Sequence, residues 1–157
     1  MIFKDHKNRS NIATTLEYVF RASPSHGHKM DKVTFLQGSC MSASPLIKDY
    51  NGKVVDVDIS ELMKEFQFQS QLYKGSARSG KLYTHTSLSI QNTESLSDSQ
   101  WEEVGNLFQK ELGFFFGETT FCFGLHHEGN NPHIHIIASR VDNNGNFIDQ
   151  HNNWEKA

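Results

Sequence analysis

Several features that would define a function class are scarce in this chain of 157 residues. Its two cysteines, Cys40 and Cys122, stand far apart, so neither a disulfide scaffold nor a thiolate zinc site is expected. Residues 1–10 are polar and charged, and no apolar run is long enough to cross a bilayer. Acidic residues outnumber lysine and arginine, which gives a net charge of −3. We therefore expect a soluble, cytoplasmic protein without membrane insertion, whose total charge does not indicate a nucleic-acid partner.

What the chain does contain is enough apolar material for one core. Hydrophobic residues make up 36% of it and include twelve phenylalanines, which excludes disorder and favours a single domain over residues 1–157. The charge is uneven along the chain. Residues 1–35 carry six basic and three acidic side chains, and residues 71–90 carry three basic and no acidic ones. Residues 91–157, in contrast, carry three basic and ten acidic side chains. Segments 1–35 and 71–90 would form a phosphate-facing surface if the fold places them side by side. An ordinary solvated surface explains these charges equally well.

The pattern of apolar residues predicts a mixed fold. Helical spacing covers residues 10–22, 59–73 and 98–112. The third helix is the best defined, because Ser97 and Gln100 form a capping-box pair before it. Strand-forming residues cover 32–40, 54–57, 82–90, 119–126 and 133–141. We expect an α+β fold with a central antiparallel β-sheet of about five strands flanked by helices.

Three histidines are expected to converge in the last two strands. Alternate side chains of a strand share a face, so His133 and His135 point the same way. In the preceding strand the phenylalanines take the core face, which leaves His126 on the face of this pair. His127 is the alternative first ligand, but it would point to the core side. The turn formers of residues 128–132 join the two strands. This spacing predicts a three-histidine metal site.

The histidine spacing alone does not select a chemistry. It also fits zinc hydrolases, oxygenases and cupin-like barrels. Glu128 is the nearest acidic candidate to hydrogen bond a ligand histidine, and a solvated turn carboxylate is an equally good interpretation. The isolated histidines His6, His26, His28 and His151 are expected to be structural or solvated.

The residues from His126 to His135 resemble the metal motif of the HUH relaxase or plasmid-mobilization nuclease family, of the MobP-like type. In that motif a histidine is followed two positions later by an acid and then by Pro-His-x-His. Residues 83–90 with the helix 98–112 resemble the family's middle segment. Residues 10–22 resemble its N-terminal helix, which carries the nucleophilic tyrosine, here Tyr18. The three motifs follow the family's order and cover nearly the whole chain.

The resemblance implies that Tyr18 is the catalytic nucleophile. On its helix Tyr18 projects away from the apolar stripe, which is unusual for a core tyrosine. The other tyrosines have ordinary explanations, since Tyr50 adjoins a turn, Tyr73 ends a helix and Tyr83 lies in a strand. A phenol is a poor nucleophile at neutral pH, so it needs a base or a nearby metal ion.

The resemblance further implies a metal-dependent DNA relaxase. Such an enzyme nicks one strand at a transfer origin through a 5′-phosphotyrosine intermediate and starts conjugative mobilization of a plasmid or mobile element. Its implied partners are single-stranded DNA, relaxosome accessory proteins and a coupling protein in a bacterial donor cell. Its implied metal is Mg²⁺ or Mn²⁺, whereas three imidazoles favour Zn²⁺ or Ni²⁺ by affinity.

Three other functions remain open at this stage. A replication initiator of the HUH type is the nearest, but its tyrosine follows the His-x-His strand, and no tyrosine follows His135. The others are a catalytically inactive metal-containing DNA-binding module and a three-histidine metalloenzyme unrelated to DNA. Because the chain stops at Ala157 without an obvious terminal element, we expect the natural domain to continue further.

Overall fold

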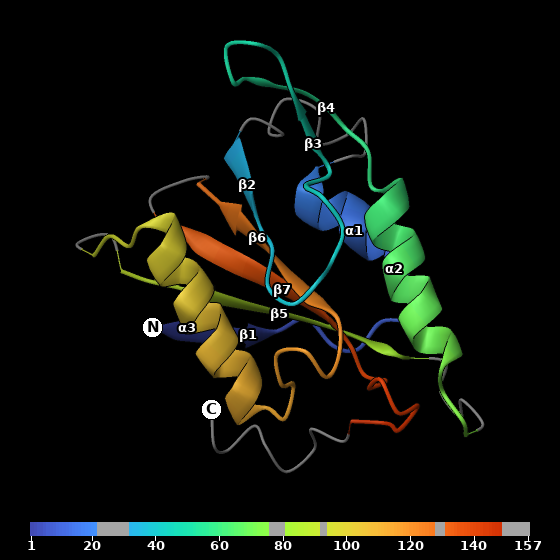
Figure 1. Ribbon diagram of the computed structural model, residues 1–157. Coiled ribbons are helices and arrows are strands. Elements are labelled where there is room, and N and C mark those ends of the chain that lie inside the picture. Colours follow the sequence, from blue (N-terminus) through green and yellow to red (C-terminus); the bar gives the residue numbers. More distant parts are fainter. Residues whose placement is uncertain (22–31, 76–80, 92–93, 128–130, 149–157) are drawn as a thin grey trace.

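A central antiparallel sheet organises the computed structural model, which describes residues 1–21, 32–75, 81–91, 94–127 and 131–148. Its strands lie in the order β1-β5-β7-β6-β2, while β3 and β4 form a separate hairpin (Figure 1). The α+β class with a five-stranded antiparallel sheet is therefore confirmed. In chain order the elements are β1 (Ile2–Asp5), α1 (Ile12–Phe20), β2 (Val33–Leu36), β3 (Leu46–Lys48), β4 (Val54–Val57), α2 (Ser60–Gln71), β5 (Tyr83–Ser89), α3 (Asp98–Glu111), β6 (Phe121–His126) and β7 (His133–Ser139).

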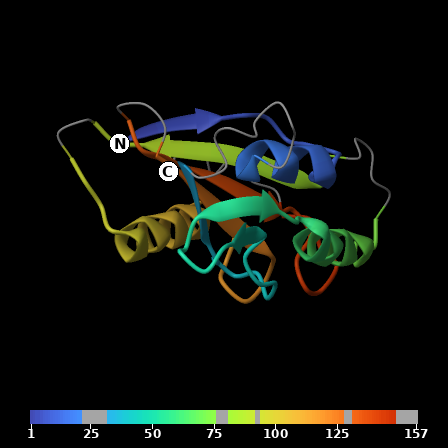
Figure 2. The same ribbon diagram turned by 90° about the horizontal axis from the view of Figure 1, so that it is seen from above.

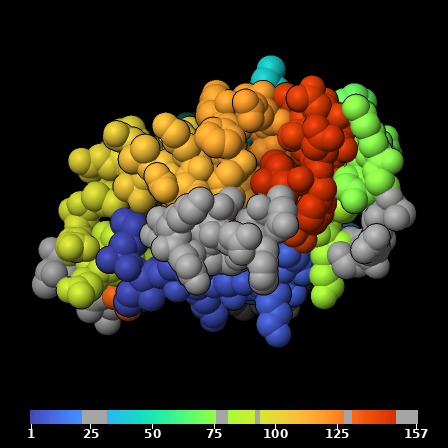
Figure 3. Space-filling view, turned by 90° about the horizontal axis from the view of Figure 1, so that it is seen from below, coloured from blue at the N-terminus to red at the C-terminus, as the bar shows by residue number. Residues whose placement is uncertain are grey.

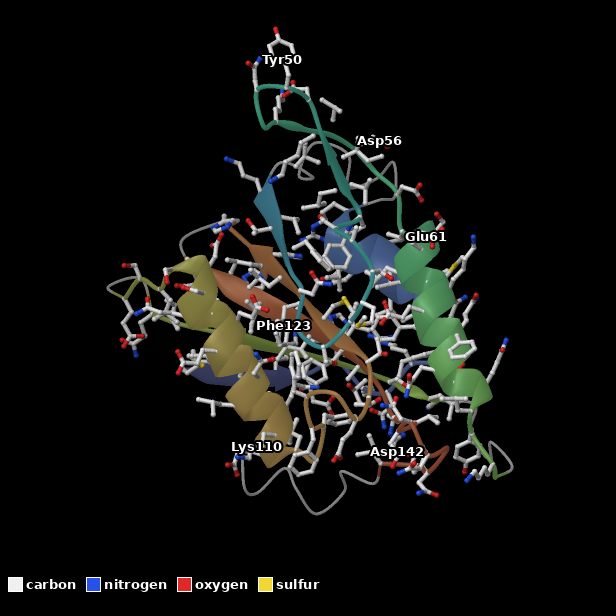
Figure 4. The ribbon with its side chains drawn as sticks, in the orientation of Figure 1. Tyr50, Asp56, Glu61, Lys110, Phe123 and Asp142 are labelled. Atoms are coloured by element: carbon white, nitrogen blue, oxygen red, sulfur yellow. The ribbon has the colours of Figure 1, made fainter. Side chains whose placement is uncertain are left out.

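The two faces of the sheet carry different helices. α3 lies across one face, where Phe123 is buried between the helix and the strands (Figure 4). α1 packs on the other face, because Val19 lies against Gly124 of β6. α2 lies beside α1, as Figure 2 shows from above. Leu62 and Phe66 of α2 close the same apolar cluster. The alternation along β6 thus divides the core into two layers.

The three predicted helices are confirmed, with shorter ends. Asn11 caps α1, since its side chain accepts a hydrogen bond from the Thr14 amide, and the capping box of Ser97 and Gln100 is complete at the start of α3. α2 begins after Ile59 without a side-chain cap. The Phe-Gln-Phe-Gln stretch in its second half is helical, although its apolar residues alternate as in a strand.

Two strands were not expected from the sequence. β1 and β3 are short, and β1 is exposed along its length, so neither has the alternation that identifies a strand. β2 is shorter than predicted because the chain turns at Gly38, whose φ is 59° and which approaches the carbonyl of Phe121 closely. After β7 an isolated antiparallel bridge joins Val141 to Phe147.

Pairing of β1 with β5 brings the two basic segments of the sequence together. The register runs from Ile2 opposite Ser89 to Asp5 opposite Thr86, so the two segments are neighbours along residues 2–5 and 86–89. The N-terminal residues lie at the surface on the side shown in Figure 3. Within the described residues, no helix has the length and apolarity needed to span a membrane.

Candidate metal centre

The β6–β7 hairpin brings the three predicted metal ligands together. His126 lies opposite His133 in the register, and Gly124 lies opposite His135. The ring centroids are 5.1 Å apart for His126 and His133, 4.3 Å for His126 and His135, and 5.0 Å for His133 and His135. One nitrogen from each ring lies within 4.8 Å of the others. The spacing suits three imidazoles that converge on one ion.

Two of these imidazoles, those of His126 and His135, are neutral at physiological pH. His126 and His135 are buried, and His133 is half-buried. Burial lowers the pKa of His126 to about 3 and lowers the pKa of His135 as well, because a charged imidazolium would lose its hydration. A neutral ring keeps one lone pair, so metal binding would not first have to expel a proton.

The partners of the ring nitrogens determine which lone pairs can bind a metal. His133 Nδ1 lies 3.0 Å from the Asn131 carbonyl oxygen, which can only accept, so this nitrogen carries the proton and Nε2 has the lone pair. His126 Nε2 lies 2.6 Å from the Val19 carbonyl oxygen, which leaves its lone pair on Nδ1. There it accepts a hydrogen bond from Arg21. The three imidazoles offer a donor set that suits a divalent ion, and the His126 member of it is hydrogen bonded to Arg21.

The ligand choice between neighbouring histidines has a structural basis. His127 follows β6 and points to the other side of the sheet, where Nε2 lies 3.1 Å from the Thr34 hydroxyl. Its side chain is exposed, whereas that of His126 is buried. The other predicted participant, Glu128, lies outside the described residues.

Two histidines that sequence reasoning did not place in the site extend the cluster. His85 Nε2 lies 2.7 Å from His135 Nδ1, and His6 stacks on His85 with ring centroids 4.2 Å apart. His6 Nε2 also lies 2.9 Å from the Ser87 hydroxyl. His6 is thus part of a cluster and not an isolated side chain. The pairing of β1 with β5 brings His6 to this cluster, and the sequence has no pattern that predicts β1. The other isolated histidines, His26, His28 and His151, lie outside the described residues.

The contact between His85 and His135 has the geometry of a hydrogen bond and not that of two nitrogens that bind one metal ion. Nitrogens that share a tetrahedral zinc ion at about 2.0–2.1 Å lie roughly 3.3 Å apart, which is longer than the 2.7 Å seen here. Burial lowers the pKa of His85 to about 3, so both rings are neutral. With the proton on His135 Nδ1, its Nε2 lone pair is free to face His126 and His133.

α1 places Tyr18 against this cluster. The Tyr18 ring lies edge-on to His135 and His85, with ring centroids 5.7 and 5.8 Å away. Its side chain is 41% exposed, so it lies at the boundary between the site and solvent. The close contact between Val19 and Gly124, which has no side chain, holds the helix at this distance from the sheet.

The competing tyrosines lie elsewhere. Tyr50 is 96% exposed and stands at the tip of the β3–β4 hairpin, away from the body of the protein (Figure 4). Tyr83 is buried, and its hydroxyl donates to Ser70. Tyr73 follows α2 and packs on Phe147. Among the four tyrosines, Tyr18 is the one in ring contact with the histidine cluster.

Comparison with known proteins identifies one family. The family model described as Relaxase, MobA/VirD2-like, nuclease domain matches residues 45–157. These residues include His126, His133 and His135, and they begin after α1, so Tyr18 lies outside the match. No curated protein matches the chain.

Proposed function

The chain belongs to the relaxase family, with a MobA/VirD2-like nuclease domain, and on this premise we propose that it nicks one DNA strand at a transfer origin with Tyr18 as nucleophile. The observation that carries the proposal is the contact between the Tyr18 ring and His135, 5.7 Å between centroids. An N-terminal helix and a C-terminal hairpin meet there. The family match does not include Tyr18, so its role is argued from this geometry.

In the proposed reaction Tyr18 Oη attacks the phosphorus of a backbone phosphate in line with the departing 3′ oxygen. The Oη–P bond forms and the P–O3′ bond breaks. The phenol proton is lost and a proton is gained by the 3′ oxygen, which leaves a free 3′-hydroxyl and a 5′-phosphotyrosine. Because one phosphate ester replaces another, the free energy of the linkage is retained and the step is reversible. Reversibility allows the enzyme to rejoin the strand after transfer.

We assign His126, His133 and His135 as the residues that hold a divalent ion. Such an ion, when bound, supplies positive charge that polarises the scissile phosphate and offsets charge on its oxygens. Mg²⁺ or Mn²⁺ is the proposed working ion, although three imidazoles also favour Zn²⁺ or Ni²⁺. With its proton on Nδ1, His135 would donate a hydrogen bond to His85 Nε2, which would fix the ring so that it presents Nε2 to the ion.

The proposed biological setting follows from this activity. The substrate is single-stranded DNA at an origin, the basic segments joined by β1 and β5 contact its phosphates, and accessory and coupling proteins assist in a bacterial donor cell. A replication initiator of the HUH type is disfavoured because the tyrosine that contacts His135 lies on α1, ahead of the His-x-His strand in the chain. An inactive DNA-binding module is the second candidate function, and the following experiment distinguishes it from a nicking enzyme.

The test is formation of a covalent adduct with fluorescent single-stranded origin oligonucleotides in Mg²⁺ or Mn²⁺, detected after denaturation. Tyr18→Phe should abolish the adduct and preserve DNA binding, because only the nucleophilic oxygen is removed. Tyr50→Phe, at the exposed hairpin tip, is the matched control and should form the adduct normally. An undiminished adduct in Tyr18→Phe rejects the assignment. Binding without adduct by the unmodified chain on its cognate origin identifies the inactive module.

A further inference from the structure

Arg21 is a buried cation at an unusual backbone position beside the histidine triad. It is the C-cap of α1 with a φ of 59°, in the left-handed region where glycine is the common residue. Its side chain is only 7% exposed. A charged side chain that is buried at a strained backbone position points to a functional role for that side chain.

Hydrogen-bond chemistry shows what Arg21 does to His126. The Val19 carbonyl oxygen can only accept, so His126 Nε2 carries its proton and the single lone pair of the ring is on Nδ1. Arg21 Nη2 donates to that nitrogen at 3.1 Å. A guanidinium remains protonated in proteins and is always a donor. The lone pair with which His126 would bind a metal ion is therefore already bonded to a cation.

A metal ion and Arg21 cannot use this lone pair together. A ligand nitrogen lies about 2.0–2.1 Å from a bound zinc ion, which leaves no place on Nδ1 for the Arg21 donor. On the basis of the metal site in the proposed function, we propose that Arg21 and the divalent ion compete for His126 Nδ1. The guanidinium released by the ion then binds the DNA phosphate that Tyr18 attacks.

The position of Arg21 relative to Tyr18 supports the second half of this proposal. Arg21 Cζ lies 5.1 Å from the centroid of the Tyr18 ring, and Nη1 donates to the Tyr18 carbonyl at 3.3 Å. The guanidinium thus lies over the ring of the proposed nucleophile, and a released Arg21 side chain would extend along this ring toward a phosphate bound there. The planar guanidinium matches two phosphate oxygens, which makes arginine a favoured phosphate ligand.

The first test is a calorimetric titration of the metal-free chain with Mn²⁺. Arg21→Gly removes the guanidinium and suits the left-handed backbone, so the fold should be retained. We expect Mn²⁺ to bind about tenfold more tightly, because a charge-assisted hydrogen bond no longer has to be broken. General damage to the site would lower the affinity. An unchanged or weaker affinity overturns the competition.

Lys7→Gly is the matched control for this titration. Lys7 also has a positive φ, of 68°, and its substitution by glycine likewise removes one positive charge. The side chain of Lys7, however, is exposed. The Mn²⁺ affinity of Lys7→Gly should equal that of the unmodified chain. An equal tightening in both variants would mean that total charge explains the effect, and the specific competition would be wrong.

The second test measures binding of a fluorescent oligothymidylate at low salt, with Mn²⁺ and with EDTA. Arg21→Gly should weaken DNA binding several-fold with Mn²⁺ and lower the salt dependence by about one phosphate contact. With EDTA the variant should match the unmodified chain, because Arg21 is then held by His126. Equal losses under both conditions overturn the released-guanidinium step.

His133→Ala separates a failure of this inference from a failure of the proposed metal site. His133 is a proposed ligand, so its removal should abolish measurable Mn²⁺ binding. If His133→Ala binds Mn²⁺ like the unmodified chain, the proposed metal site is wrong. If His133→Ala loses Mn²⁺ and Arg21→Gly does not tighten it, only the role of Arg21 is wrong. Thermal unfolding without metal shows that each variant is folded.

Discussion

The two faces of the central sheet use the same strands for different purposes. On the α3 face the side chains of β6 and β7 are apolar and fully buried, from Phe121 and Phe123 to Ile134 and Ile136. On the α1 face Cys122 and Ile137 pack in the apolar cluster, while the histidines of the same two strands are grouped at one end. Strand alternation therefore places stabilising and chemical residues on opposite sides of one hairpin.

The comparison shows how a polar site can be built into a buried sheet. Burial of an imidazole is unfavourable unless its nitrogens are hydrogen bonded. Each buried histidine of β6 and β7 has such a bond, to Val19 and Arg21 for His126 and to His85 for His135. The α3 face needs no such bonds, because apolar burial alone stabilises it. Substitutions on the two faces should therefore separate stability from function.

The largest stability loss is expected from Phe123→Ala on the α3 face. Phe123 is fully buried against Gly105, so its removal should lower the free energy of unfolding by about 3–5 kcal/mol. Chemical denaturation measures this loss. Ile136→Val, with an expected loss of about 0.5–1.5 kcal/mol, provides a folded variant of the same face. Unchanged Mn²⁺ affinity in Ile136→Val would support the separation of the faces, and a tenfold weaker affinity would contradict it.

A functional loss larger than the stability loss is expected from His126→Ala, which also removes the hydrogen bonds of His126 to Val19 and Arg21. Removing a ligand should weaken Mn²⁺ binding by more than the roughly 10–100-fold typical for a residue that only supports a ligand. His127→Ala is the control, because its side chain lies on the other side and is exposed. Calorimetry and adduct yield measure both variants. Equal losses would mean that the ligand is assigned to the wrong histidine.

Much of this arrangement was predictable because it is local. His126, His133 and His135 lie in one hairpin, where alternation and a short turn determine which face each side chain takes. α3 was predictable for the same reason, since its capping box lies within four residues of sequence. Tyr18 was identified by resemblance, and its outward direction followed from the helical stripe.

The rest depends on contacts distant in sequence. His6 and His85 join the cluster only through the register of β1 with β5, and the short, exposed β1 has no pattern that reveals it. Arg21 reaches His126 because its backbone turns left-handed after α1, a conformation that arginine seldom adopts. Long-range register and an atypical cap leave no signature in a single sequence.

A matched pair of glycine substitutions sharpens the comparison at the two helix contacts. A β-carbon at Gly124 would lie 2.5 Å from Val19 Cγ1, and one at Gly105 would lie 2.7 Å from the Phe123 ring. Each alanine variant should therefore lose about 1–3 kcal/mol of unfolding free energy through overpacking. Helix propensity offsets part of this loss for Gly105→Ala.

The two glycine variants should differ in function. Gly124→Ala pushes α1 away from the sheet and moves Tyr18 relative to His135, so the adduct yield should fall far more than stability does. Gly105→Ala displaces α3, on the opposite face, and should keep the adduct yield of its folded fraction. Denaturation and adduct assays on both proteins test this. Similar adduct yields in the two variants would show that the position of α1 does not control the reaction.

The smallest expected effect is that of Ser97→Ala at the start of α3. The Ser97 hydroxyl accepts a hydrogen bond from the Gln100 amide at 3.2 Å, so the substitution removes one cap from a helix that only supports the apolar face. The free energy of unfolding should fall by about 1 kcal/mol. Mn²⁺ affinity and adduct yield should not change, because α3 contributes none of the histidines. The lost cap loosens only the end of the helix. A change in Mn²⁺ affinity or in adduct yield, with a stability loss no larger than this, would therefore mean that the two faces of the sheet are coupled through the strands.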